Sequence, residues 1–505
     1  MNRKQEQDLL AKIATGISGF DIISEGGLPE GRTTLISGTA GSGKTIFATQ
    51  FLAEGIKQGQ NGVFVSFEEP PKMLRKNMRG FNWNISQWET ENKWCFVDAS
   101  PLDRNMPLVS GEYDLEPLLS RLRYAIDRVD AQRVTMDSLG AIFSYVPDIG
   151  QVRATLFKLA QVIREMNITA VLTSERISDY GEISRYGIEE FVADNVIIMR
   201  NALTEEKRRR SIEILKLRGV PHQHGEFPFA IVPEQGIVII PFSTDVLKRK
   251  SSSRRITSGS NDLDAMCGGG WFKGSIILVS GATGTGKTLM ATEFISGGVK
   301  NDEKCLLLAF EESRDQLLRN ALGWGVDFEQ MEKEGKLKIV CRYPELTGLE
   351  SHFISIREQI EQFNPQRVAI DSISALERVS SIKGFREFLL TLNTLFKEKG
   401  ITALGTANTA NLIGSESITE SNISTNTDLI ILLRYVEIYG EIKRGLAVLK
   451  MRGSKHDKDI REFLIDDRGM HLGKPFRNIM GILTGNPTFA DADEIDRLNN
   501  LLTET

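Results

Sequence analysis

The sequence predicts an α/β fold in two tandem copies, each with a mostly parallel, twisted sheet flanked by helices. Three observations predict it. The chain repeats itself over most of its length, each half alternates short apolar runs with amphipathic stretches, and each half has a glycine-rich loop directly after an apolar run. The length of 505 residues also exceeds that of one ordinary domain. Alternating strands and helices are typical of parallel sheets, because a parallel connection returns through a helix.

The internal repeat rests on motif pairs that occur in the same order in both halves. The pairs are Gly38 with Gly281 and Glu68 with Glu311, each 243 positions apart, and Asp137 with Asp371 and Lys216 with Lys450, each 234 positions apart. The smaller spacing places nine extra residues in the first half, and we expect them in "DASPLDRNMPLVSGEYD". The repeat predicts domains at 1–246 and 256–480, a basic, Ser-rich linker at 247–255, and a loop and tail at 481–505.

The expected elements follow the apolar runs. "TTLIS" and "IILVS" precede the glycine loops, and "GVFVSF", "RVTMD", "ITAVLT" and "NVIIMR" read as further strands, with helices such as "LEPLLSRLRYAIDRV" between them. The runs "IEILKLRG" and "QGIVIIPF" predict an antiparallel addition near the end of a domain.

Composition and charge exclude several classes of protein. The net charge of −5 gives no electrostatic basis for nucleic-acid binding. The four cysteines form no CxxC pair and the five histidines form no metal-ligand pattern, so we expect reduced thiols and no histidine metal site. The N-terminus lacks the apolar segment of a secretory signal and no run is apolar enough to span a bilayer, which predicts a cytoplasmic protein.

Two loops of the form GxxxxGK[ST] predict nucleotide sites, because glycines let the backbone wrap phosphates and the following helix presents its positive end. A glycine turn with an unrelated lysine is the alternative, and the duplication disfavours it. The predicted phosphate-binding residues are Gly38, Thr39, Ala40, Gly41, Ser42, Gly43, Lys44 and Thr45, and Gly281, Ala282, Thr283, Gly284, Thr285, Gly286, Lys287 and Thr288. Lys44 and Lys287 are expected to reach the β- and γ-phosphates of ATP, and Thr45 and Thr288 to bind Mg²⁺.

Acidic residues at strand ends are candidates for metal binding and catalysis. Asp137 and Asp371 each end an apolar strand, as a metal-holding Walker-B aspartate does, although a helix N-cap is the alternative. Two glutamate pairs each follow a strand and precede a helix, where a carboxylate can polarise a water or a hydroxyl. These pairs are Glu68 with Glu69 and Glu311 with Glu312. Acidity favoured at a helix start is the alternative.

The motifs "KLR" and "KMR" place two cations two residues apart on a predicted strand. They comprise Lys216, Leu217 and Arg218, and Lys450, Met451 and Arg452. Such a pair is either a solvated strand edge or a device that contacts a neighbouring subunit's nucleotide in trans.

The segment "SNISTNTD" distinguishes the two halves. Asp194 and Asp428 fix the register of the repeat here, so Ser424 aligns with Glu190, and Thr425 aligns with Phe191. Only the second half therefore has hydroxyls at these places. A polar loop is the alternative, but the difference favours a phosphoacceptor pair and a kinase function for the second half.

These residues resemble the KaiC family of RecA-like ATPases over nearly the whole chain. The resemblance rests on both P-loops, both glutamate pairs, "LKLRG", "LKMRG", "RYGIEEFVADNVI" and "SITESNISTNTD". It implies a homohexamer of two stacked rings with ATP between neighbours, hydrolysis in the N-terminal ring with Glu68 as catalytic carboxylate, and autophosphorylation and dephosphorylation of Ser424 and Thr425 in the C-terminal ring. Glu311 would be the general base with Glu312 beside it, Arg378 would reach across the interface, and Thr419 would be a transient acceptor.

The resemblance also implies partners. A KaiB-like protein would bind the N-terminal ring, and downstream histidine kinases would read the state. The tail "GILTGNPTFADADEIDRLNNLLTET" departs from the family after its first residues, which leaves a KaiA-like activator open. Two other readings remain, a RecA-like DNA recombinase or helicase and an ATP-bound scaffold ring without phosphotransfer. The net charge argues against the first, and the glutamate and acceptor pairs argue against the second.

Overall fold

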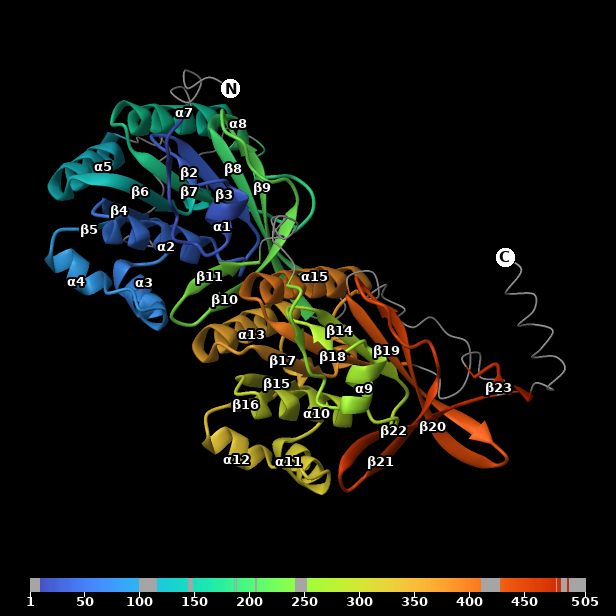
Figure 1. Ribbon diagram of the computed structural model, residues 1–505. Helices are drawn as coiled ribbons and strands as arrows, with labels where there is room; N and C mark the ends of the chain where they lie inside the picture. The colour runs from blue at the N-terminus through green and yellow to red at the C-terminus, as the bar shows by residue number, and fades with distance from the viewer. Residues whose placement is uncertain are drawn as a thin grey trace, which may run out of the picture. The chain divides into compact units, whose positions relative to one another are not determined.

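The computed structural model describes residues 10–99, 116–143, 149–185, 187, 189–204, 207–240, 252–409, 427–477, 479–482 and 488–489. The chain divides into two compact units, Met1–Pro241 and Phe242–Thr505. Each unit contains a sheet flanked by helices (Figure 1).

The N-terminal unit is built on one nine-stranded sheet with the order β11-β10-β9-β8-β3-β7-β6-β4-β5. The strands from β8 to β5 are parallel, and β9, β10 and β11 add an antiparallel edge. The strands are β3 (Thr33–Gly38), β4 (Asn61–Ser66), β5 (Trp94–Asp98), β6 (Ala131–Asp137), β7 (Thr169–Glu175), β8 (Asn195–Thr204), β9 (Lys207–Leu217), β10 (Glu226–Val232) and β11 (Gly236–Ile239), with a small pair β1 (Lys12–Ile13) and β2 (Leu28–Pro29).

Helices cover both faces of this sheet. The helix α2, directly after β3, packs against β4 and β6, whereas α5 and α7 share a separate apolar cluster with Leu35, Val63 and Val134. The helices are α1 (Phe20–Ile23), α2 (Lys44–Lys57), α3 (Pro71–Asn77), η2 (Met78–Phe81), α4 (Ile85–Thr90), α5 (Glu116–Val129), α6 (Leu139–Phe143), α7 (Ile149–Glu165) and α8 (Glu189–Val192).

The C-terminal unit repeats this plan with the sheet order β16-β15-β17-β18-β14-β19-β20-β21-β22. The strands are β14 (Ile276–Gly281), β15 (Cys305–Ala309), β16 (Leu337–Cys341), β17 (Arg367–Asp371), β18 (Thr402–Asn408), β19 (Leu429–Ile438), β20 (Glu441–Met451), β21 (Arg461–Asp466) and β22 (Gly469–Pro475), with small strands β12 (Arg255–Ile256), β13 (Trp271–Phe272), β23 (Ile479–Met480) and β24 (Thr488–Phe489). The helices are α9 (Asn261–Met266), α10 (Lys287–Lys300), α11 (Arg314–Gly323), α12 (Phe328–Lys333), η4 (Pro344–Leu346), α13 (Leu349–Phe363), α14 (Ile373–Glu377) and α15 (Ile382–Lys399).

The predicted fold class is confirmed. Both units have a mostly parallel sheet flanked by helices, and the predicted antiparallel portion is present: β9 includes residues 212–217 of "IEILKLRG", and β11 includes residues 236–239 of "QGIVIIPF". Each position in one sheet order has its counterpart in the other, from β5 and β16 to β11 and β22. The structure therefore allows a residue of one domain to be compared with its equivalent in the other.

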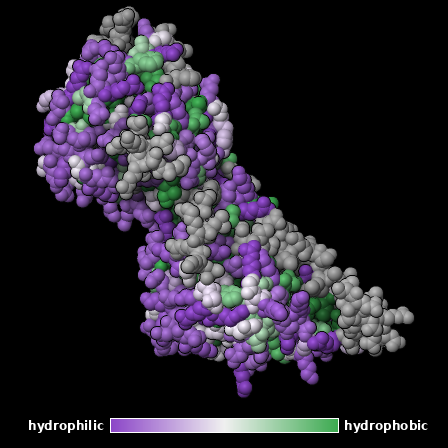
Figure 2. Space-filling view, turned by 45° about the horizontal axis from the view of Figure 1, so that its top comes forward, coloured by the Kyte–Doolittle hydropathy of each residue, from purple (hydrophilic) through white to green (hydrophobic). Residues whose placement is uncertain are grey.

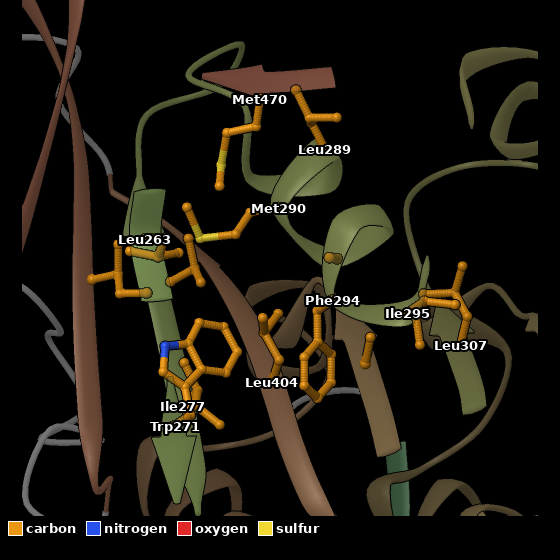
Figure 3. Packing of buried hydrophobic residues seen from close by; sticks show 14 of the residues in the cluster. Leu263, Trp271, Ile277, Leu289, Met290, Phe294, Ile295, Leu307, Leu404 and Met470 are labelled. Carbon is orange, nitrogen blue, oxygen red and sulfur yellow. The ribbon is translucent and has the colours of Figure 1, made fainter. Parts of the chain in front are cut away.

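The core of the C-terminal unit lies between the sheet and α10 (Figure 3). Met290, Phe294 and Ile295 of α10 belong to one apolar cluster with Ile277 of β14 and Leu307 of β15, two strands that β17 and β18 separate. Buried helices and strands of this kind are apolar on the face that they share, so burial of these side chains fixes the P-loop helix against its strand.

The described surface is mainly hydrophilic, with hydrophobic residues in small scattered groups on the face that Figure 2 presents. In the described part of the chain, no helix combines the length and apolarity needed to cross a membrane.

One buried position differs in charge between the two units. Glu293 of α10 is buried and its Oε1 accepts a hydrogen bond from the Met470 backbone N–H (3.3 Å), and this burial raises the pKa of the Glu293 carboxyl. The equivalent residue of α2 is Gln50, which contacts the equivalent strand through the Ile237 N–H (2.8 Å) and donates to the carbonyl of Gly16 (2.9 Å). The amide makes the same kind of contact without a charge.

We therefore expect Glu293→Gln to stabilise the C-terminal unit at pH 7 by about 1 kcal/mol. A carboxyl whose pKa is raised by folding stabilises the folded state fully below its unfolded pKa, and this contribution is lost as the pH rises through its folded pKa. The gain should therefore vanish at pH 4. Hydrogen exchange of the α10 amides measures it. Gln50→Glu is the converse control and should destabilise α2 at pH 7; an equal gain at both pH values would contradict the prediction.

Candidate functional site

The P-loop of the N-terminal unit joins the carboxyl end of β3 to α2. Gly38 pairs with Met199 of β8, and a Cβ at Gly38 would approach the Met199 carbonyl oxygen to 2.5 Å, so the close pairing requires glycine. Gly43 has φ 97°, which lets the chain turn into the first residue of α2, Lys44. Lys44 Nζ donates to the carbonyls of Gly38 (2.9 Å) and Thr39 (3.1 Å), and burial lowers the pKa of its ammonium group.

The predicted metal residues of this unit are in contact with one another. Thr45 Oγ1 donates to Asp137 Oδ2 (2.6 Å), and Asp137 stands at the end of β6. The other carboxylate oxygen of Asp137 accepts a hydrogen bond from Thr173 of β7. Hydroxyl and carboxylate oxygens are the donors that Mg²⁺ prefers, so the residues present fit this ion.

The C-terminal unit has the same arrangement. Lys287 Nζ donates to the Ala282 carbonyl (2.8 Å) and has a pKa lowered by burial. Thr288 Oγ1 donates to Asp371 Oδ2 (2.7 Å), and Thr406 donates to the other oxygen of Asp371. Asp371 is buried, and this burial raises the pKa of its carboxyl. Both P-loops are thus tied to the strand that carries the aspartate.

The two catalytic candidates have different surroundings. Glu68 accepts a hydrogen bond from the Ser138 hydroxyl, and burial raises the pKa of the Glu68 carboxyl although this hydrogen bond opposes the rise. Glu311 instead accepts weak hydrogen bonds from Asn408 Nδ2 (3.3 and 3.4 Å) and lies 3.7 Å from Arg378 Nη2. One carboxylate is therefore held by a hydroxyl, and the other by an amide and a cation.

The second glutamate of each pair accepts a hydrogen bond from an asparagine. Asn77 Nδ2 donates to Glu69 Oε2 (3.0 Å), and Asn320 Nδ2 donates to Glu312 Oε2 (3.2 Å). Burial and the nearby Asp371 carboxylate raise the pKa of Glu312. Both asparagines stand on the helix that follows the pair, so these glutamates also fasten that helix.

Several contacts at the sites were not predicted. Arg210 Nε donates to the Gly41 carbonyl (3.1 Å), and Arg444 Nε donates to the Gly284 carbonyl (3.3 Å), so each P-loop is also held by an arginine from the antiparallel edge. The repeat itself contains the signal, because these arginines are 234 positions apart, as Lys216 and Lys450 are. Ser138 and Asn408 gave no comparable signal, since an isolated Ser or Asn after a strand is ordinary.

The cation pairs lie near the amino ends of the parallel strands, which we call the amino edge of the sheet. The P-loop of the same unit follows the carboxyl end of its strand, at the carboxyl edge. Leu217 of β9 pairs with Asn195, and Asn195 pairs with Thr34 at the start of β3, whereas the P-loop follows Gly38. At about 3.3 Å per residue, four residues of strand separate these levels by about 13 Å. Lys216 Nζ donates to the Ala193 carbonyl (2.8 Å).

The cation pair of the second unit has the same place. Arg218 lies 3.6 Å from Asp194, and Arg452 lies 3.8 Å from Asp428. Burial lowers the pKa of Lys450. Met451, between the two cations, ends β20 and is buried. In both units the structure keeps this motif away from the predicted catalytic residues of the same domain.

The predicted phosphoacceptors Ser424, Thr425 and Thr419 lie outside the described residues. The described chain resumes at Thr427, and the Asp428 N–H donates to the Ile276 carbonyl at the start of β14 (2.8 Å). Asp428 therefore lies at the amino edge of the sheet. Lys450 and Arg452 lie at the same edge, because the Arg452 N–H donates to the Asp428 carbonyl (2.9 Å).

The fold and the two sites define a tandem P-loop ATPase of the RecA-like superfamily. The family model described as "ATPase: KaiC" matches residues 13–244 and again 256–475, and the chain belongs to the KaiC family. It is 64% identical to the circadian clock protein KaiC3 of Synechocystis over 99% of both chains. It is 49% identical to the circadian clock oscillator protein KaiC of Synechococcus elongatus, over 99% of this chain and 96% of that one. Membership of an ATPase family implies that the chain binds ATP.

Proposed function

We propose that this chain is a KaiC-type ATPase and autokinase whose N-terminal unit hydrolyses ATP and whose C-terminal unit phosphorylates and dephosphorylates Ser424 and Thr425. The observation that carries the proposal is a duplicated ATPase site with one difference between the copies. Both copies hold a lysine, a threonine, an aspartate and a glutamate in the same order around the P-loop. A pair of hydroxyl residues precedes β19 of the second copy, whereas no such pair precedes the equivalent strand, β8, of the first.

In the proposed reaction each residue has a separate task. The P-loop amides and Lys287 bind the phosphates, and Thr288 and Asp371 hold Mg²⁺, which neutralises charge on the phosphates when bound. Glu311 accepts the proton of the attacking hydroxyl of Ser424 or Thr425. In the N-terminal unit Glu68 acts on water instead, and its raised pKa places it closer to neutral pH, where a general base is more effective.

We further propose that the sites are completed between subunits of a homohexameric double ring. The P-loop lies at the carboxyl edge of each sheet, whereas the cation pair and the end of the acceptor segment lie at the amino edge. An acceptor segment that ends at one edge and a P-loop at the other are brought together when the amino edge of one subunit faces the carboxyl edge of the next. Lys216, Arg218, Lys450 and Arg452 would then contact the neighbour's nucleotide.

The phosphorylation state would be read by partners. A phosphate on Ser424 or Thr425, four or three residues before Asp428 in the sequence, adds about −2 charge, which is enough to rearrange a subunit contact. By their names the relatives are circadian clock proteins. We propose a role in a clock or a related timing system, with a KaiB-like partner on the N-terminal ring, downstream histidine kinases, and a KaiA-like activator as an open question.

Two inactive variants test both proposals in one mixture. Lys287→Ala should abolish phosphate transfer by its own chain, and Ser424→Ala/Thr425→Ala should remove the acceptors. After incubation with ATP and Mg²⁺, each variant alone should carry no phosphate at these positions. In the mixture, mass spectrometry should find phosphate on Ser424 and Thr425 of the Lys287→Ala chain.

The wild-type chain is the control for this experiment. If it carries phosphate at Ser424 or Thr425 and the mixture does not, transfer between subunits is wrong. If the wild type hydrolyses ATP but carries no phosphate there, with or without an added KaiA-like protein, the autokinase proposal is wrong.

A further inference from the structure

We infer that Glu345 and His352 are positioning residues for Glu311 and that they act through Arg378. This inference rests on the proposed autokinase function, because it concerns the carboxylate that accepts the proton of the hydroxyl. It names two residues, one on the turn η4 and one on the helix α13, that no sequence motif includes.

Arg378 stands between two carboxylates. The same nitrogen, Nη2, lies 3.7 Å from Glu311 Oε1 and 3.8 Å from Glu345 Oε1. Both distances exceed the length of a charge-assisted hydrogen bond, so the cation attracts each carboxylate without capping either. Glu345 therefore holds Arg378 back from a closed ion pair with Glu311, which would occupy the oxygen that has to accept a proton.

His352 fixes the turn that carries Glu345. Its side chain is buried, and its Nε2 lies 3.1 Å from the carbonyl oxygen of Pro344 and 3.0 Å from Thr347 Oγ1. A carbonyl oxygen only accepts hydrogen bonds, so Nε2 carries the hydrogen. The imidazole thus contacts Pro344, the residue before Glu345, and Thr347, the residue after the turn.

The same imidazole also contacts the residue before Glu311. Its ring packs edge-on against Phe310, with centroids 5.6 Å apart and planes at 88°. Phe310 directly precedes Glu311 in the chain. One buried side chain therefore sets the relative positions of the two carboxylates that share Arg378.

The sequence of the N-terminal unit differs at the positions equivalent to Arg378 and His352. The helices α6 and α14 correspond residue for residue, so Arg378, which follows α14, corresponds to Ser144. By the same spacing of 234 positions, His352 corresponds to Leu118, a buried apolar residue of α5. At these two positions the unit proposed to act on water has a leucine and a serine, and the unit proposed to act on a protein hydroxyl has an imidazole and a guanidinium.

The test measures the rate of phosphate incorporation into Ser424 and Thr425 in the full chain with ATP and Mg²⁺. Glu345→Gln should slow it about tenfold, because Arg378 can then close on Glu311. Glu345→Asp should restore part of the rate. In an Arg378→Gln background, adding Glu345→Gln should have no further effect, since Glu345 acts only through Arg378. An equal loss in both backgrounds, or no loss in either, would overturn the inference.

A second pair of variants tests His352. His352→Leu copies the N-terminal unit and should also slow incorporation about tenfold, whereas His352→Gln keeps a donor and should recover most of the rate. Hydrogen exchange of the α10 amides, which lie in the same unit as His352, serves as the control for folding and should be unchanged. Equal rates in the two variants would overturn the role of His352. If the wild type incorporates no phosphate, the proposed function fails; if it does and Glu345→Gln matches it, only this inference fails.

Discussion

Replacing Glu311 by glutamine is expected to reduce phosphate incorporation at Ser424 and Thr425 by about 10²- to 10⁴-fold, the usual contribution of a general base. The amide keeps the size of the side chain and can still contact Asn408 and Arg378, so a loss would reflect the missing proton acceptor. Phosphopeptide mass spectrometry over time measures incorporation, and release of inorganic phosphate from ATP measures hydrolysis in the same sample.

Glu68→Gln is the matched variant in the other unit. It should reduce ATP hydrolysis by a comparable factor and leave the initial rate of incorporation at Ser424 and Thr425 unchanged, because Glu68 lies in a separate compact unit. If Glu311→Gln reduced hydrolysis and Glu68→Gln reduced incorporation, the division of labour between the units would be reversed. If neither variant affected incorporation, Glu311 would not be the base.

The second large effect concerns stability. Arg367 is fully buried at the start of β17, where its Nε contacts Glu303 Oε2 at 2.5 Å and its Nη1 donates to the carbonyls of Thr257 (2.8 Å) and Phe294 (3.0 Å). Arg367→Met should cost the C-terminal unit about 3–5 kcal/mol, because it leaves Glu303 without its cation and removes the guanidinium donor from two carbonyls. This is a large part of the stability of an ordinary domain.

The N-terminal unit supplies the control for this variant. There Arg133 is equally buried, but Gln60 takes the place of Glu303 and accepts from Arg133 Nε (2.8 Å). Burial lowers the pKa of Arg133 to about 10. Arg367→Met/Glu303→Gln should therefore be more stable than Arg367→Met alone. Limited proteolysis and hydrogen exchange of β17 would measure the difference, and equal protection would show that the ion pair contributes nothing.

The fold could be predicted from the sequence because its signals are local and duplicated. A P-loop after an apolar run fixes a strand, a turn and a helix at once, and the second copy removes accidental matches such as an unrelated lysine. The antiparallel edge was also predicted, since "IEILKLRG" continues the pattern of apolar strands.

The surroundings of the catalytic carboxylates could not be predicted in the same way. Ser138 and Asn408 contact Glu68 and Glu311 through the packing of distant strands, and the sequence gives no sign of such contacts. The resemblance implied that Arg378 reaches across an interface, and this stays a prediction; within its own chain its Nη2 lies 3.7 Å from Glu311 Oε1. Which partner a long, half-exposed arginine selects depends on the tertiary arrangement and not on its neighbours in sequence.

The opposite placement of the two edges has a kinetic consequence. A chain whose P-loop opens at one edge of the sheet, and whose acceptor segment ends at the other, would follow a rate law that depends on how many chains have assembled. Dilution below the assembly concentration should then lower phosphorylation per chain, whereas an intramolecular reaction would proceed at the same rate per chain. The phosphate on Ser424 and Thr425 would record assembly as well as the supply of ATP.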